Sequence, residues 1–164
     1  MNITSLVERI ERTPGCRVHP HSGLPEPQAG HILPDDLRTF YEVCGGAELF
    51  ERAAFPISIS SPQNLRLSNP VILVGVSEEE LADPEYGFSR SWYIIGESHS
   101  ANYISIDLGP ERPGYCYDSF WDIHPFNSTI MSTSFTELLR LLLDTNGEYY
   151  RDDPGFQVLG DAYP

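Results

Sequence analysis

Two neighbouring apolar runs constrain the fold of this chain more than any other feature: Trp92–Ile95 and Tyr103–Leu108. In the second run every other residue is aliphatic, which predicts a half-buried antiparallel strand. The first run has no polar face, which predicts a central strand or one that bulges near Gly96. A short polar loop joins the runs, so we expect two paired strands. Neither run carries a motif for chemistry.

Helices are predicted on both sides of this pair. The first is expected from about Ser5 to Arg12, because Ser5 and Glu8 have capping-box spacing. The second is expected within residues 33–46, with Pro34 in its first turn. Its apolar residues share one face: Leu37, Phe40, Tyr41 and Cys44. The last helix is expected to begin at Ser134, which forms a second capping box with Glu137.

The remaining apolar segments are predicted to be strands, at residues 55–60, 71–76 and 115–117. The run from Val71 to Val76 is nearly all apolar, as in a strand covered on both faces, and Pro70 suits its start. The order of elements predicts an α+β fold, with a mainly antiparallel central sheet and helices from both ends of the chain packed around it. We expect one domain over residues 1–164, ending in a tail at 148–164 that has no clear period.

The chain is strongly acidic. Its formal net charge is −14, and all ten basic residues are arginine. Such a charge repels nucleic-acid phosphates and anionic membranes, and it attracts a basic protein partner. The alternative is that acidity serves solubility alone. No apolar run is long enough to span a bilayer, and the first residues do not resemble a secretory signal. With three cysteines, an odd number, these features predict a cytoplasmic protein with reduced thiols.

Five segments in order resemble motifs of the SUKH superfamily, which includes the yeast Smi/Knr-type cell-wall regulators and many bacterial immunity proteins. The segments span residues 33–143: LPDDLRTFYEVCGG, WYIIGE, YISIDL, GYCY and SFTELLRLLL. Cys44 stands where the family pattern often has Asn. The resemblance implies a SUKH-like α+β domain. In bacteria it also implies a cytoplasmic immunity protein that binds and blocks a polymorphic toxin, often a nuclease or deaminase, and the family is not known for a conserved set of catalytic residues. The eukaryotic branch leaves a second possibility, a regulatory scaffold in cell-wall or stress signalling.

Acidic side chains are the first candidates for a toxin-binding surface. On one surface they would mimic phosphates toward a basic groove: Glu78, Glu79, Glu80, Glu97, Asp107, Asp118 and Asp122. The alternative for Asp107 is that it caps its own turn, and for Glu78–Glu80 that they form a solvated face.

Aromatic side chains are the second candidates, because Tyr and Trp are enriched in binding hot spots. The residues are Tyr115, Tyr117, Phe120, Trp121 and Phe126. Aromatic residues of strands are more often in the core. Trp121 is the best choice because it has polar neighbours.

Metal and catalytic sites are less favoured. A zinc site could use Cys16, His19, His21 and His31, but the loop of residues 16–32 has no paired Cys-x-x-Cys, and solvated histidines are the alternative. Cys116 with His124, or Ser98 with His99, could act as nucleophile and base. Carboxylates could also hold magnesium. No nucleophile elbow or phosphate-binding loop supports an enzyme, so the prediction is a non-enzymatic protein without a cofactor.

Overall fold

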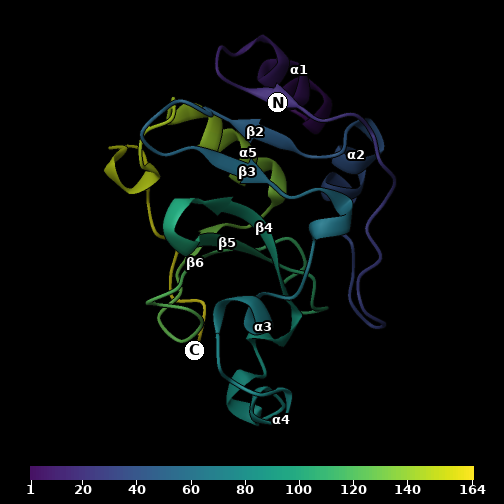
Figure 1. Ribbon diagram of the computed structural model, residues 1–164, viewed down its shortest axis with the longest axis vertical. Helices are drawn as coiled ribbons and strands as arrows, with labels where there is room; N and C mark the ends of the chain where they lie inside the picture. Colours follow the sequence, from purple (N-terminus) through teal and green to yellow (C-terminus); the bar gives the residue numbers. More distant parts are fainter.

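The computed structural model describes residues 1–164 and has the predicted α+β fold (Figure 1). Its seven strands form one sheet in which each strand pairs antiparallel with the next one in the chain. The strands are β1 (Arg17–Val18), β2 (Ala47–Leu49), β3 (Ile57–Ile59), β4 (Trp92–Ser98), β5 (Asn102–Asp107), β6 (Cys116–Phe120) and β7 (Ile130–Ser132).

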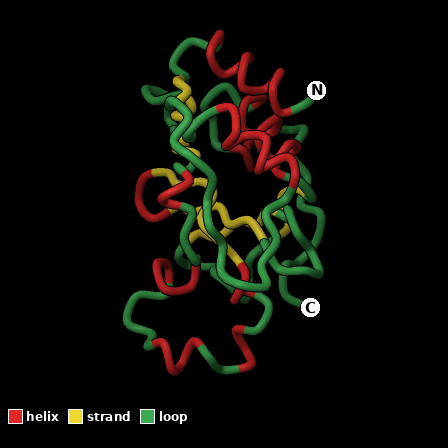
Figure 2. The backbone as a smooth tube through the Cα atoms, turned by 90° about the vertical axis from the view of Figure 1, so that its right-hand side faces the viewer, coloured by secondary structure: helices red, strands yellow, loops and turns green.

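Five α-helices accompany the sheet: α1 (Ile3–Arg12), α2 (Asp35–Val43), α3 (Ser68–Ile72), α4 (Glu78–Leu81) and α5 (Phe135–Asp144). Helices α1, α2 and α5 pack against one another and gather toward the N-terminal end of the molecule (Figure 2). No helix has the length and apolar character needed to cross a membrane. The main core has 26 buried residues, most of them from these three helices and from the strands.

Strands β4 and β5 confirm the predicted pair. Strand β4 is the middle strand of the sheet, and its register with β5 shifts between Ile94 and Gly96, so both alternatives given for this run hold. A Cβ atom on Gly96 would come within 3.3 Å of the Ile104 side chain, so this position favours glycine. The prediction of a half-buried β5 is wrong, because Ser105 and Asp107 are buried along with the aliphatic face. Helix α3 covers this part of the sheet, and the Ser68 and Ser105 hydroxyls lie 2.7 Å apart.

The predicted strand at Val71–Val76 is wrong. Residues Ser68–Ile72 form α3, and Pro70 lies in its first turn, where a missing N–H costs no hydrogen bond. The side chains of Ser68 and Asn69 are buried and bonded to neighbouring polar groups, which fixes the helix against the sheet. The apolar run then ends in a turn, where Val74 is 88% exposed. A short apolar run cannot distinguish a strand from a helix.

The helix boundaries differ from the prediction at two places. Asn2, not Ser5, caps α1 by accepting the Ser5 backbone N–H, so the predicted box with Glu8 is wrong. The earlier start places Ile3 in the core. Ser134 does cap α5 by accepting the Glu137 N–H, but the Glu137 carboxylate accepts from Thr133 and leaves the box half formed. Pro34 lies at the N-cap of α2, one position before the helix.

The C-terminal tail is an integral part of the fold. Residues Tyr150–Asp152 form a 3-10 helix, and Asp161 makes an isolated bridge with Thr129 beside β7. Ala162 is buried against Trp92 and Tyr117 in a second, smaller core cluster. The tail therefore covers the edge of the sheet that β7 would otherwise expose.

Candidate functional site

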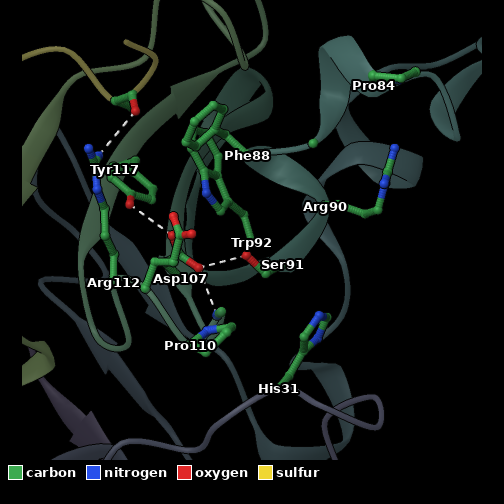
Figure 3. Close-up of a pocket in the computed structure, with 14 residues that line it drawn as sticks. His31, Pro84, Phe88, Arg90, Ser91, Trp92, Asp107, Pro110, Arg112 and Tyr117 are labelled. Carbon is green, nitrogen blue, oxygen red and sulfur yellow. Dashed lines mark hydrogen bonds between the residues drawn. The ribbon is translucent and has the colours of Figure 1, made fainter.

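A pocket of about 440 Å³ lies where β4 begins and β5 ends (Figure 3). Its walls come from segments far apart in the sequence: residues 84–92, residues 107–112, Tyr117, Ala162 and His31. Binding sites for small groups are commonly hollows of about 300–1,000 Å³ in which a few polar side chains converge. The pocket has these properties, and its central polar group is the carboxylate of Asp107.

Three neutral donors hold the Asp107 carboxylate. Its Oδ1 accepts from the Ser91 hydroxyl at 2.7 Å and from the Gly109 N–H at 2.8 Å, and its Oδ2 accepts from the Tyr117 hydroxyl at 2.9 Å. The bond to Gly109 is the turn-capping contact expected of an Asp at this position. Burial raises the pKa of Asp107, and these hydrogen bonds lower it by less. Asp107 forms no ion pair.

Two arginines line the pocket without pairing to a carboxylate. Arg90 donates to the carbonyl oxygens of Ala82 and Asp83, at 2.8 and 2.9 Å. Arg112 donates to the Ala162 carbonyl at 3.2 Å, and its guanidinium lies 5.8 Å from the centre of the Tyr115 ring. Both guanidinium groups are thus committed to the backbone of neighbouring segments.

An aromatic cluster forms the inner wall of the pocket. The Trp92 and Tyr117 rings lie at a centroid distance of 4.1 Å with their planes tilted by 31°, and His124 meets Trp92 edge-on at 5.7 Å. His124 Nε2 lies 2.8 Å from Asn69 Oδ1. Because the Asn69 amide nitrogen donates to Ser89, we assign the imidazole proton to Nε2, which leaves the buried Nδ1 without a partner. Burial lowers the pKa of His124 to about 3.

The acidic candidates do not form one surface. Glu78, Glu79 and Glu80 make up nearly all of α4 and are exposed at the end of the molecule opposite α1 (Figure 1). Glu97 and Asp122 are also exposed. Asp107 and Asp118 are buried, so the expectation that they belong to an exposed acidic face is wrong. Both are held inside by hydrogen-bond donors.

Asp118 has a structural partner in the tail. Its side chain is 0% exposed, and Arg151 donates to its Oδ2 from two nitrogens, with Nε at 2.9 Å. Arg151 also donates to the Thr129 hydroxyl. This ion pair fixes the tail to β6, which explains the position of Asp118 in the strand.

A polar groove runs beside Glu97 on the open face of the sheet. Two hollows of about 520 and 340 Å³ share Glu48, Ser58 and Glu97, which are in register across β2, β3 and β4. Glu48 pairs with His19 at 3.0 Å, and Arg66 reaches Glu97 at 3.8 Å. Glu48 was not among the predicted site residues, and the only signal for it in the sequence is the short alternation over Ala47–Leu49, which places it opposite the two buried apolar side chains.

The aromatic candidates divide between core and surface. Tyr117 is buried, and Phe120 packs among Phe55, Tyr149 and Tyr150. Tyr115 is partly buried. Trp121 is 64% exposed and Phe126 is also exposed, so these two of the five candidates are available to a partner.

The candidate catalytic pairs are not assembled. Cys116 Sγ contacts the Gly114 carbonyl and lies in the main core, where burial raises its pKa, whereas His124 bonds to Asn69. Ser98 donates to the Pro56 carbonyl, and His99 is exposed.

The candidate zinc ligands also have separate environments. Cys16 Sγ accepts from Phe50 N–H, His19 faces Glu48 and His31 faces Tyr93. No group of three or more His, Cys, Asp or Glu side chains is placed to hold a metal ion.

Comparisons with known proteins agree with this architecture. The model of the SMI1/KNR4 family (SUKH-1) matches residues 26–141. Over 168 residues the chain is 39% identical to immunity protein YokJ of Bacillus subtilis (strain 168), covering 99% of this chain and 96% of that protein. No solved structure gives a significant match.

Proposed function

The chain belongs to the SMI1/KNR4 family (SUKH-1), and we propose that it is an immunity protein that binds and neutralises a toxin. The observation that carries this proposal is the identity of 39% to an immunity protein over nearly the whole of both chains. The match includes the tail and the N-terminal helix, not only the family motifs. We propose that residues 1–164 act as one domain, which is supported by the shared core and by the bound tail.

We propose that the toxin carries a basic surface, such as the substrate groove of a nuclease. The net charge of −14 supports this, because opposite charges speed the encounter of two proteins. The same charge disfavours nucleic acid and anionic membranes as direct partners. The protein would work in the cytoplasm as a stoichiometric inhibitor, without an enzymatic step or a cofactor.

The acidic lobe, which we define as residues 73–90, is the proposed centre of the docking surface. It carries Glu78, Glu79, Glu80, Asp83 and Glu85, all exposed, and one arginine. The lobe projects at one end of the molecule (Figures 1 and 2). Val74 adds an exposed apolar side chain, which suits an interface centre surrounded by charge. Glu97, Trp121 and Asp122 remain proposed contacts at a lower priority.

Replacing charges without changing shape tests the lobe. The triple variant Glu78→Gln, Glu79→Gln, Glu80→Gln keeps α4 capped, because Gln can replace Glu80 in the box with Ser77. Its matched control is Glu8→Gln, Glu11→Gln, Glu42→Gln, which removes three exposed charges from α1 and α2. We expect the lobe variant to weaken binding to the toxin domain encoded beside this gene at least tenfold more than the control does. Equal weakening would mean that only the overall charge matters and that the lobe is not the docking surface.

A further inference from the structure

We infer that the pocket at Asp107 receives the guanidinium group of an arginine side chain from the toxin. This inference deepens the proposed function and rests on it. The pocket adjoins the acidic lobe, since Pro84, Gly87 and Phe88 belong to both. A partner that binds the lobe would therefore also cover the pocket, and one of its side chains could enter.

The first argument is the missing counter-ion. Asp107 is 6% exposed, yet all three of its donors are neutral. Buried carboxylates are normally paired with a cation, as Asp118 of this chain is with Arg151. A guanidinium in the pocket would supply that charge where little water screens the attraction.

The second argument is the space and the free acceptor. Oδ1 of Asp107 already accepts two hydrogen bonds, whereas Oδ2 accepts one, from Tyr117. A carboxylate oxygen can accept two. The Trp92 indole N–H also acts on this carboxylate, but from beyond hydrogen-bond distance, so Oδ2 has room for one more donor. The ring of Trp92 lies beside this carboxylate, and Phe88 lines the pocket farther from it (Figure 3). A guanidinium stacks on aromatic rings and is weakly hydrated, so it suits this environment better than an ammonium does.

The two arginines that line the pocket do not act as the counter-ion of Asp107. Arg112 is bound to the Ala162 carbonyl, and the guanidinium of Arg90 is turned away from Asp107 toward the lobe (Figure 3). Glu111 also lines the pocket and offsets part of their charge. The two arginines do offer an alternative, an anion site, which the experiment must separate from the arginine site.

The experiment titrates the full-length protein with Nα-acetyl-L-arginine methylamide and follows the indole N–H signals by NMR. The chain has two tryptophans. Trp92 lines the pocket and its Nε1–H has no hydrogen-bond partner, whereas Trp121 is exposed and lies outside the pocket. We expect a saturable shift of the Trp92 signal alone. The lysine analogue should bind more weakly, and Asp107→Asn should weaken binding of the arginine probe about tenfold or more.

A second variant protects the test against misfolding. Phe88 is 43% exposed, so Phe88→Ala removes one wall without opening the core, and it should weaken probe binding several-fold even if Asp107→Asn does not fold. If the variants fold and bind the arginine probe as tightly as wild type does, the inference is overturned. A Trp92 shift with inorganic phosphate but not with the arginine probe would also overturn it, in favour of an anion site.

The probe titration needs no toxin, so the two proposals fail separately. If the arginine probe binds but the toxin domain does not, the result supports the arginine pocket and refutes the proposed immunity function. If the toxin domain binds wild type and Asp107→Asn equally well and the arginine probe does not bind, only the inference about the pocket is refuted.

Discussion

Protonation of His124 should destabilise the fold as the pH falls. The neutral ring is buried beside Trp92, its Nε2–H is used by Asn69, and no acceptor is available for a proton on Nδ1. Burial lowers the pKa in the folded state from 6.5 to about 3. The unfolded chain therefore binds a proton at a higher pH than the folded chain, so stability is fully present above pH 6.5 and is lost progressively toward pH 3.

The pKa values of His124 in the unfolded and folded states give the size of this loss of stability. Between about pH 7.5 and about pH 5, the free energy of unfolding should fall by about 2 kcal/mol because of His124 alone. That loss is a substantial part of the roughly 5–15 kcal/mol that stabilises a typical domain. Asp107 acts in the opposite direction, because its raised pKa lets the folded state take up a proton first. Its contribution is common to variants that differ only at His124.

Urea denaturation of wild type and His124→Gln at both pH values isolates the effect. Gln keeps a donor for Asn69 and cannot take up a proton in this pH range, so its stability should fall by about 2 kcal/mol less than that of wild type. His21→Gln is the matched control, because His21 is exposed, and it should behave like wild type. An identical pH dependence in His124→Gln and wild type would refute the argument that a buried neutral imidazole limits stability in acid.

Three further predictions follow from particular contacts. Ser134→Ala and Asn2→Ala should each destabilise the fold by about 1 kcal/mol in chemical denaturation, whereas Ser5→Ala should cost less, because Ser5 caps no helix. Arg151→Met leaves the Asp118 carboxylate buried without its partner and should lower the free energy of unfolding by about 3 kcal/mol. The double variant with Asp118→Asn should recover part of that loss. Additive losses would show that the pair is not coupled. If charge steers association, the association rate with the toxin domain should fall steeply from low salt to about 0.15 M in stopped-flow measurements, and a flat response would mean that the acidity serves only solubility.

The sequence predicted the elements whose apolar pattern is long enough to be unambiguous. The faces of α2 and α5 and the pairing of β4 with β5 followed from residue spacing, and both alternatives for the first apolar run hold, because β4 is central in the sheet and bulges near Gly96. Strands β1, β2 and β7 were missed because they are two or three residues long, and the alternation over Ala47–Leu49 is too short to indicate a strand by itself. The segment 71–76 was misread because its structure depends on the buried hydrogen bonds of Ser68 and Asn69, which are long-range contacts.

The candidate site was harder to predict for a similar reason. Charge grouped Asp107, Asp118 and Glu97 as candidates for one acidic surface, with turn capping as the alternative for Asp107. The fold instead places Asp107 in a pocket, Asp118 in an internal ion pair and Glu97 in an open groove. The partner of Asp118 lies 33 residues away in the tail, where no periodic pattern indicated structure. Local sequence therefore identified the residues with chemistry, but only the packed fold assigned their environments.

Growth protection by the wild-type protein tests the central claim most directly. A candidate toxin domain from the genes that neighbour this one would be expressed in cells with and without the protein, and complex formation would be measured on the purified pair at low salt. We predict restored growth and a stoichiometric complex. Continued growth arrest, with no complex between the purified proteins, would contradict the assignment of this chain as an immunity protein.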